Sequence, residues 1–98
     1  MIVVIKGALH SLGPIFTLPG SDRICRKAII EKKYNDARMR NDYFPVIIYG
    51  KDDIWKFLEN HNDKIKNQEC RVTVKLTGRI KNGRDSLTLT FKSVHWII

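Results

Sequence analysis

The amino-acid sequence predicts an all-β protein with one helix. Five short apolar segments, several of them rich in β-branched residues, are separated by glycine, proline, asparagine and aspartate. One stretch has the three- and four-residue spacing of an amphipathic helix. An Asn-Gly pair separates two alternating segments near the end of the chain, which is the strongest short-range signal for a hairpin. We expect one domain over residues 1–98.

Three strands are predicted before the helix. Residues 2–5, Ile-Val-Val-Ile, predict the first, with Gly7 inside or just beyond it as a bend. Gly-Pro and Pro-Gly pairs then indicate a loop. Residues 24–33 predict the second strand, although its centre breaks strict alternation. Residues 44–49 predict the third strand, which is expected to end at Gly50.

The helix is predicted from its apolar spacing. Asp52 or Asp53 is expected to cap its N-terminus, and Trp55 on the first turn is interpreted as a structural residue. The expected buried face consists of Ile54, Phe57, Leu58, His61 and Ile65. A histidine on such a face is interpreted as a hydrogen-bonded core residue.

Two strands follow the helix. Residues 72–77 and 87–92 alternate between apolar and polar side chains, and Asn82-Gly83 between them predicts a type I′ turn, which requires positive φ at both central residues. The order strand, strand, strand, helix, strand, strand matches the five-stranded Greek-key barrel of the OB-fold, with the helix between strands three and four. An SH3-like barrel has no helix of this length there.

The charge of the chain favours a polyanionic partner. Lysine and arginine number 18 against 10 acidic residues, which gives a net charge of +8. The excess is unevenly distributed: residues 21–42 carry +3 and residues 71–98 carry +5, whereas the helix-containing residues 43–70 carry −1. The positive segments include most of the surface on which OB-folds bind oligonucleotides.

Aromatic residues follow the same surface. If the even-numbered residues of the third strand face the core, Tyr43, Pro45, Ile47 and Tyr49 face outward. Bases stack on such tyrosines without sequence preference. The alternative is that Tyr49 packs under the helix and Tyr43 lies in a subunit contact.

The residues resemble a known family. Residues 43–51, Tyr-Phe-Pro-Val-Ile-Ile-Tyr-Gly-Lys, followed by a helix and by residues 72–80, resemble the third strand, helix and fourth strand of bacterial single-stranded DNA-binding proteins. Residues 26–31 and the chain's ending also resemble small uncharacterised OB domains of the Bacteroidetes, thought to be related to those proteins. The resemblance covers nearly the whole chain and implies single-stranded DNA as the partner.

The resemblance also implies the site residues. The DNA-stacking aromatics fall on Tyr43 and Tyr49, while Tyr34 stands in for a tryptophan late on the second strand. Phosphate contacts are expected from Arg26, Lys32, Lys33, Arg38, Arg40, Lys75, Arg79, Lys81 and Arg84. A solvated strand edge or turn is the alternative for any one cation. The hairpin shortened to residues 81–85 and the absence of an acidic tail do not favour DNA wrapping or recruitment of replication proteins.

Catalysis, metals and cofactors are not expected. The histidines share no common spacing, Asp52 and Asp53 suit a helix N-terminus better than a metal pair, and the phosphate-loop, zinc-protease and nucleophile-elbow motifs are missing. Cys25 and Cys70 lie 45 positions apart without a C-x-x-C pattern, so we expect reduced, buried thiols.

The sequence therefore predicts a sequence-tolerant single-stranded DNA-binding protein for replication, recombination or repair, acting as a homo-oligomer, a dimer or tetramer. It has no apolar run of membrane-spanning length and no signal-peptide pattern, so a cytoplasmic location is expected. An RNA-binding OB module is one alternative, although the second strand has no aromatic before Tyr34. Another is an oligomeric or protein-interaction scaffold with Ile47, Ile97 and Ile98 as the contact. Trp96 is interpreted as a core or oligomer-contact residue.

Overall fold

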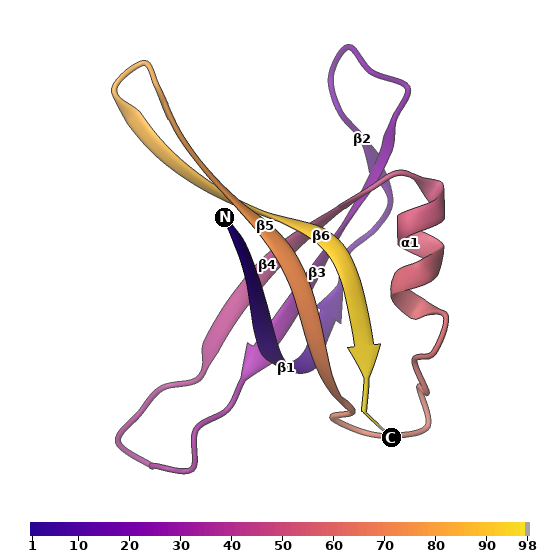
Figure 1. Ribbon diagram of the computed structural model, residues 1–98, viewed down its shortest axis with the longest axis vertical. Coiled ribbons are helices and arrows are strands. Elements are labelled where there is room, and N and C mark those ends of the chain that lie inside the picture. The colour runs from indigo at the N-terminus through magenta and orange to yellow at the C-terminus, as the bar shows by residue number, and fades with distance from the viewer. Residues whose placement is uncertain (98) are drawn as a thin grey trace.

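The computed structural model describes residues 1–97. Its elements in chain order, shown in Figure 1, are β1 (Ile2–Leu12), β2 (Phe16–Thr17), β3 (Ile24–Lys32), β4 (Asp42–Tyr49), α1 (Lys51–Leu58), β5 (Glu69–Lys81) and β6 (Arg84–Trp96).

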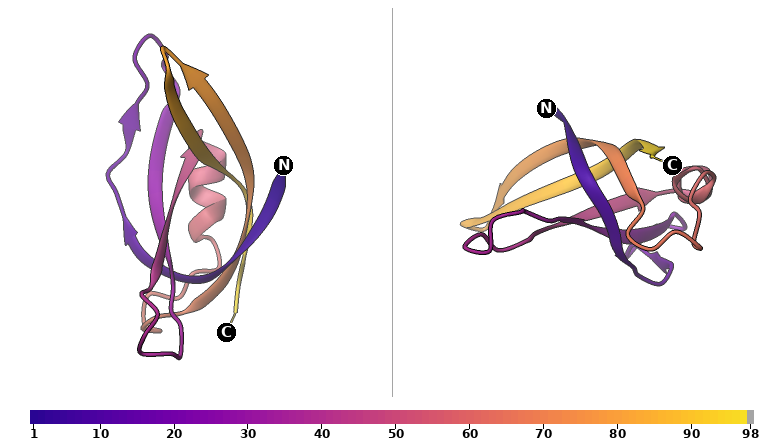
Figure 2. Two further views of the ribbon diagram at one scale, coloured as in Figure 1. Left: turned by 90° about the vertical axis from the view of Figure 1, so that its left-hand side faces the viewer. Right: turned by 90° about the horizontal axis from the view of Figure 1, so that it is seen from below.

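The strands close into the predicted OB-fold barrel. They are paired in the order β1-β5-β6-β4-β3, and β1 also pairs with β3, which joins the two ends of the sheet (Figure 2). All of these pairings are antiparallel except that of β4 with β6. The two-residue β2 was not predicted; it pairs only with the beginning of β3, because the loop after β1 folds back along it.

The closure of the barrel depends on β1. Its residues Ile2–Ala8 pair with β5, its residues Ala8–Leu12 pair with β3, and the register shifts between Leu9 and Ser11. The strand is therefore much longer than the predicted residues 2–5. Gly7 lies within it where β3 crosses closely: a Cβ there would come within 2.4 Å of the Glu31 carbonyl oxygen.

Alternating residues of the strands fill the barrel. Val46 and Ile48 of β4 are fully buried, as the alternation predicted, and they pack with Ile30, Val72 and Val74. The odd-numbered residues of β4 consequently face away from the core.

The helix α1 covers one end of the barrel, on the right in Figure 1. Phe57 is fully buried and its ring contacts those of Phe91 and Trp96 edge-on, with centroids 5.5 and 5.6 Å apart. The indole Nε1 of Trp96 donates a hydrogen bond of 2.8 Å to the Phe57 carbonyl oxygen. Trp96 is thus a core residue, one of its two predicted roles.

The predicted helix was too long and its predicted cap was wrong. Gly50, with φ of 86°, occupies the N-cap position, and no side chain of the described residues caps α1. The helix ends at Leu58, because the Glu59 amide turns to the Lys56 carbonyl and asparagines follow, which are weak helix formers. His61 lies beyond the end of α1.

The end of α1 at Leu58 and the exposure of its side chains change the interpretation of three residues. His61 is half-buried in the loop after α1, and its ring lies 4.5 Å from that of Trp96, so it packs near the core from outside the helix. Ile65 is exposed. Trp55 is 67% exposed, so its interpretation as a structural residue was wrong.

The hairpin of β5 and β6 is long rather than shortened. Asn82 and Gly83 have φ of 53° and 72°, which confirms the predicted turn with two positive values. However, each strand continues for 13 residues, so the hairpin extends beyond the barrel as a two-stranded ribbon (Figures 1 and 2). The prediction of a shortened hairpin was wrong, because it considered only the turn and not the length of β5 and β6.

Both cysteines are buried, as predicted, and neither forms a disulfide in the described structure. Burial raises the pKa of the Cys70 thiol to about 11. Within residues 1–97, no helix has the length and apolar character needed to cross a membrane.

Replacing Gly7 with alanine tests the closure of the barrel. We expect Gly7→Ala to lower the free energy of unfolding by about 1–3 kcal/mol or more, because the added Cβ overlaps the β3 backbone. Gly78→Ala is the matched control: Gly78 is also a strand glycine, but its Cβ would meet nothing closer than a Leu87 methyl at 4.0 Å. Equal unfolding midpoints in denaturant for the two variants would contradict this explanation.

Candidate nucleic-acid interface

The outward residues of four neighbouring strands form one surface, which we call the outer face. Lys27 of β3 is paired with Ile47 of β4, Ile47 with Thr90 of β6, and Thr90 with Lys75 of β5. Paired residues lie on the same side of a sheet. A row therefore crosses β3, β4, β6 and β5 with a lysine at each end.

The tyrosines of β4 lie on this outer face, as predicted. Tyr43 is 51% exposed and Tyr49 is half-buried, and Pro45 and Ile47 lie between them on the same side. Tyr43 and Tyr49 are six positions apart, which corresponds to about 20 Å of extended strand. The two rings can therefore contact different nucleotides of one strand.

Tyr43 belongs to a cluster built around the Glu31 carboxylate. Its ring meets that of His10 edge-on, with centroids 5.0 Å apart. The carboxylate oxygens of Glu31 lie 3.7 Å from Lys33 Nζ and 3.9 Å from His10 Nδ1, and one accepts a hydrogen bond from the Asn41 amide. A hydrogen bond from the Tyr43 hydroxyl, with a further contribution from Lys33, lowers the pKa of Glu31. These contacts place the Tyr43 ring beside His10 and Glu31.

Tyr49 has a cationic neighbour at the other end of β4. The guanidinium carbon of Arg23 lies 5.5 Å from the centre of its ring, which is a cation–π contact. The alternative that Tyr49 packs under the helix is therefore replaced by packing against Arg23. A shallow cleft of about 300 Å³ beside them also includes Lys51 and Asp53.

The β5–β6 ribbon extends the outer face beyond the barrel. Arg79 is paired with Ser86 and Lys81 with Arg84, on the same side as Lys75. The opposite side carries the exposed apolar residues Ile80 and Leu87. The ribbon thus has a cationic side that continues the lysine row.

Other predicted cations do not join this surface. Arg26 is paired with the fully buried Ile48, so it points to the inner side of β3, where its Nε donates a 2.7 Å hydrogen bond to the Gly13 carbonyl oxygen. Lys32 also points to the inner side and lies over the ring of Tyr34, 5.3 Å from its centroid. The Tyr34 hydroxyl hydrogen-bonds to Asp42, which lies on the side of β4 opposite to Tyr43, so Tyr34 does not join the tyrosines of the outer face.

Arg38 and Arg40 lie on the loop between β3 and β4, at the lower left of Figure 1. A hydrogen bond from the Arg38 amide, together with the Arg38 guanidinium that pairs with Asp36 at 3.3 Å, lowers the pKa of the Asp36 carboxyl. Arg40 is exposed. Both can approach a nucleic-acid strand that leaves the outer face beside Tyr43. Neither lies on a strand of the barrel.

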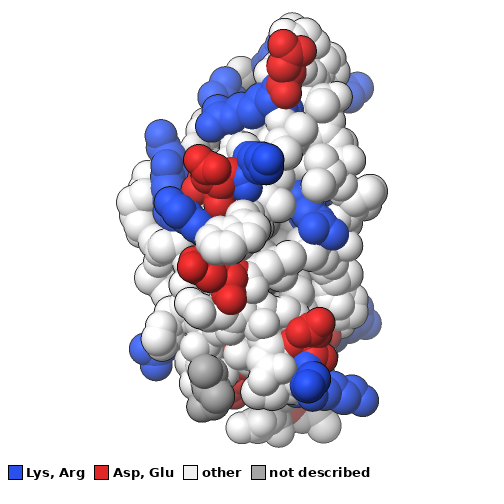
Figure 3. Space-filling view, turned by 90° about the vertical axis from the view of Figure 1, so that its right-hand side faces the viewer, with Lys and Arg blue, Asp and Glu red and all other residues white. Residues whose placement is uncertain are grey.

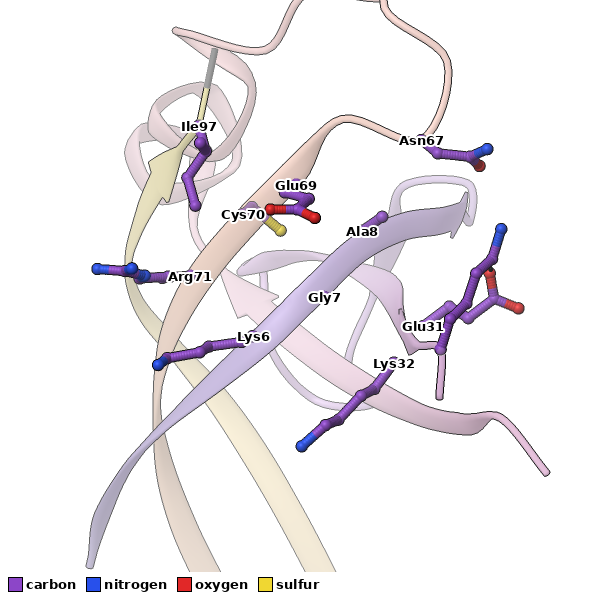
Figure 4. A pocket seen from close by; sticks show the side chains of 11 residues that line it. Lys6, Gly7, Ala8, Glu31, Lys32, Asn67, Glu69, Cys70, Arg71 and Ile97 are labelled. Carbon is purple, nitrogen blue, oxygen red and sulfur yellow. Dashed lines mark ion pairs between the residues drawn. The ribbon is translucent and has the colours of Figure 1, made fainter. Parts of the chain in front are cut away.

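A cleft of about 400 Å³ lies where β1 passes from β5 to β3. Figure 4 shows Lys6, Lys32 and Arg71 projecting from three different strands around it, and Lys33, Glu31 and Glu69 complete its charged lining. Cationic side chains therefore surround this end of the barrel as well.

Several residues near these surfaces were missed by sequence reasoning: His10, Arg23, Lys27, Lys51, Lys6 and Arg71. Lys27 could have been found, because it alternates with the buried Ala28 and thus faces outward on β3. His10 could not, because its contact with Tyr43 depends on the extension of β1 and on the register shift after Leu9.

Comparison with solved structures supports the fold. No protein-family model matches the sequence, and none of the curated proteins compared with it is similar in sequence. The mitochondrial single-stranded DNA-binding protein Rim1 of S. cerevisiae superposes with a TM-score of 0.76 at 15% identity, over 99% of this chain and 95% of Rim1. The SSB domain of a Synechococcus protein gives 0.61 at 12% identity, over 96% and 92%.

The N-terminal domain of PriB from Thermoanaerobacter tencongensis, described as dimeric, gives a TM-score of 0.55 at 16% identity, over 99% of this chain and 96% of that domain. The chain is therefore similar in structure to OB-fold proteins of the single-stranded DNA-binding type. At these identities the likeness establishes the fold.

Titration of Glu31 tests the cluster that holds Tyr43. An NMR titration should give the Glu31 carboxyl a pKa below its ordinary value, and Tyr43→Phe should raise it, because the hydroxyl that hydrogen-bonds to the ionised form is lost. Since the pKa is lower in the folded state, the cluster stabilises the fold above the unfolded-state pKa, and this contribution is lost as pH falls through the folded value. An identical Glu31 pKa in Tyr43→Phe would contradict the assignment.

Proposed function

We propose that this protein binds single-stranded DNA with little sequence preference, along the outer face, in replication, recombination or repair. The observation that carries the proposal is the presence of two tyrosines on one strand, flanked by Lys27 on one side and Lys75 on the other. Stacking rings within a cationic groove are the chemistry of sequence-tolerant single-strand binding. The structural likeness to proteins named for this activity supports it.

The bases would stack on Tyr43 and Tyr49, while the phosphates follow the cations. Lys27 and Lys75 flank the tyrosines within the barrel, and Arg79, Lys81 and Arg84 on the ribbon would bind the phosphates of a strand that continues past β6. Each phosphate contact releases condensed counterions, so affinity should fall steeply with salt. Glu31 would act as a positioning residue, because it hydrogen-bonds to Tyr43 from the neighbouring strand.

Self-association is part of the proposal. The outward residues Ile2 and Val4 of β1 are exposed, at 59% and 56%, and within residues 1–97 no strand pairs with the second edge of this half of β1. An open strand edge with apolar side chains favours pairing with a second copy. Ile47 and Ile97, the contact expected from the sequence, are both half-buried, and Ile98 lies outside the described residues.

Substitution of Tyr43 tests the binding proposal. Tyr43→Leu should weaken binding to a labelled dT oligonucleotide by about 1–3 kcal/mol, because one stacking contact is removed from the outer face. The measurement is fluorescence anisotropy at several salt concentrations. The slope of affinity against salt should stay unchanged, because the cations remain.

The control for Tyr43→Leu is Trp55→Leu, which removes an even more exposed aromatic residue from α1. It should leave dT affinity unchanged. Binding of duplex and single strand with equal affinity, or binding of neither, would contradict the proposed function; equal effects of the two substitutions would contradict the assignment of the face.

The oligomer has its own test. Val4→Lys should convert the assembly to monomers in light scattering after size exclusion, because it places a charge on the open edge of β1. Ile80→Lys is the control, since Ile80 is 80% exposed at the far end of the ribbon. A monomeric wild-type protein, or dissociation of both variants alike, would exclude this interface.

A further inference from the structure

A second surface lies between α1 and the segment that leads into β3. It is a groove of about 500 Å³ lined mainly by apolar side chains, and we call it the helix groove. Its lining consists of Ile15, Ile24, Ile54, Trp55 and Leu58, with Arg26, Lys51 and Glu59. Figure 3 looks at the side of the molecule that carries α1 and shows uncharged surface interrupted by lysine, arginine and acidic side chains.

Two apolar residues in the walls of the helix groove are well exposed. Trp55 is 67% exposed and Ile15 is 55% exposed, although Ile54 beneath them is buried. A tryptophan exposed beside aliphatic residues in a concave site is typical of a protein-binding surface, where buried aromatic anchors supply most of the affinity. Packing within the chain does not explain why this position is tryptophan.

The charge in the groove indicates what it binds. Arg26 is half-buried at its base, its Nε is held by the Gly13 carbonyl oxygen, and among residues 1–97 no carboxylate lies within ion-pair distance of it. Lys51 adds a second cation at the N-terminal end of α1, and Glu59, the single acid of the lining, lies at the other end. A half-buried guanidinium without a counterion favours a carboxylate ligand.

We propose that the helix groove binds an acidic peptide segment of a partner protein, with an aromatic or aliphatic side chain against Trp55 and Ile15 and a carboxylate on Arg26. The site shares Lys51 with the cleft beside Tyr49 but otherwise lies apart from the outer face, because Arg26 points to the inner side of β3 and α1 covers the end of the barrel. A nucleic-acid strand would need a continuous row of cations, whereas this groove offers one guanidinium and one lysine between apolar walls, with an acid at its far end. The proposal does not depend on DNA binding.

Titration with a synthetic peptide tests this proposal. The probe is a labelled Asp-Glu-Asp-Leu-Phe peptide with a free carboxyl terminus, measured by anisotropy and by tryptophan fluorescence. Trp96 is buried, so Trp55 reports occupancy. We expect saturable binding that Trp55→Ala and Lys51→Glu each weaken about 5- to 30-fold, the range of one interface anchor. Lys64→Glu, an equal charge change on the loop after α1, should leave the affinity unchanged.

Two altered peptides separate the contributions. Serine in place of leucine and phenylalanine removes the apolar anchors, and lysine in place of the acids reverses the charge; neither peptide should bind. Binding of the lysine peptide as tightly as the acidic one, no binding of the acidic one, or no effect of Trp55→Ala would overturn the proposal.

Two other occupants give different results. If dT oligonucleotides displace the acidic peptide and Trp55→Leu abolishes DNA binding, the groove is part of the DNA site and the proposal fails. If Trp55→Ala converts a dimer to monomers, a second copy of the chain occupies the groove and the proposal also fails. Peptide binding with no DNA binding would leave this inference standing while contradicting the proposed function.

Discussion

The close approach of β1 and β3 at Gly7 is the constraint on which the structure depends. One strand must pair with β5 through its first half and with β3 through its second, so the sheet can close only where β1 passes from one partner to the other. At that point the Glu31 carbonyl oxygen occupies the space that a Cβ would need. Glycine removes the overlap, and the bulge after Leu9 adjusts the register so that the remaining pairs can form.

The same crossing determines the candidate binding surface. The residue whose carbonyl meets Gly7 is Glu31, and its side chain points outward to hold Tyr43, while β1 supplies His10 against the same ring. Closure also brings β4 beside β6, which aligns the β4 tyrosines with Lys75 of β5 across Thr90. A surface with two tyrosine rings between cationic borders therefore results from the topology of the barrel. The helix α1 lies at one end of the barrel, so the helix groove can bind a different ligand.

Local patterns predicted most of the fold. Alternation identified the inward residues of β4, and Asn82-Gly83 identified the last hairpin, because both signals depend on near neighbours. The predicted end of the helix was wrong, because the apolar spacing continues by chance through the loop that contains His61 and Ile65. Of the site, the outward tyrosines were predictable. The contact of His10 with Tyr43 was not, since it depends on the register shift in β1 and on pairing between distant segments. The inner-side placement of Arg26 follows from the same alternation that places Lys27 outward.

The central claim is that single-stranded DNA binds to the outer face. Mapping the position of a bound oligonucleotide on the protein tests it most directly. Amide chemical shifts would be followed by NMR as a dT oligonucleotide is added. The structure predicts that the largest shifts fall on β3 and β4 around Tyr43 and Tyr49, and then across β6 to Lys75 and the ribbon. The amides of α1 beyond its first turn should stay unchanged. Shifts concentrated on α1 around Trp55, with the β4 amides unaffected, would contradict it.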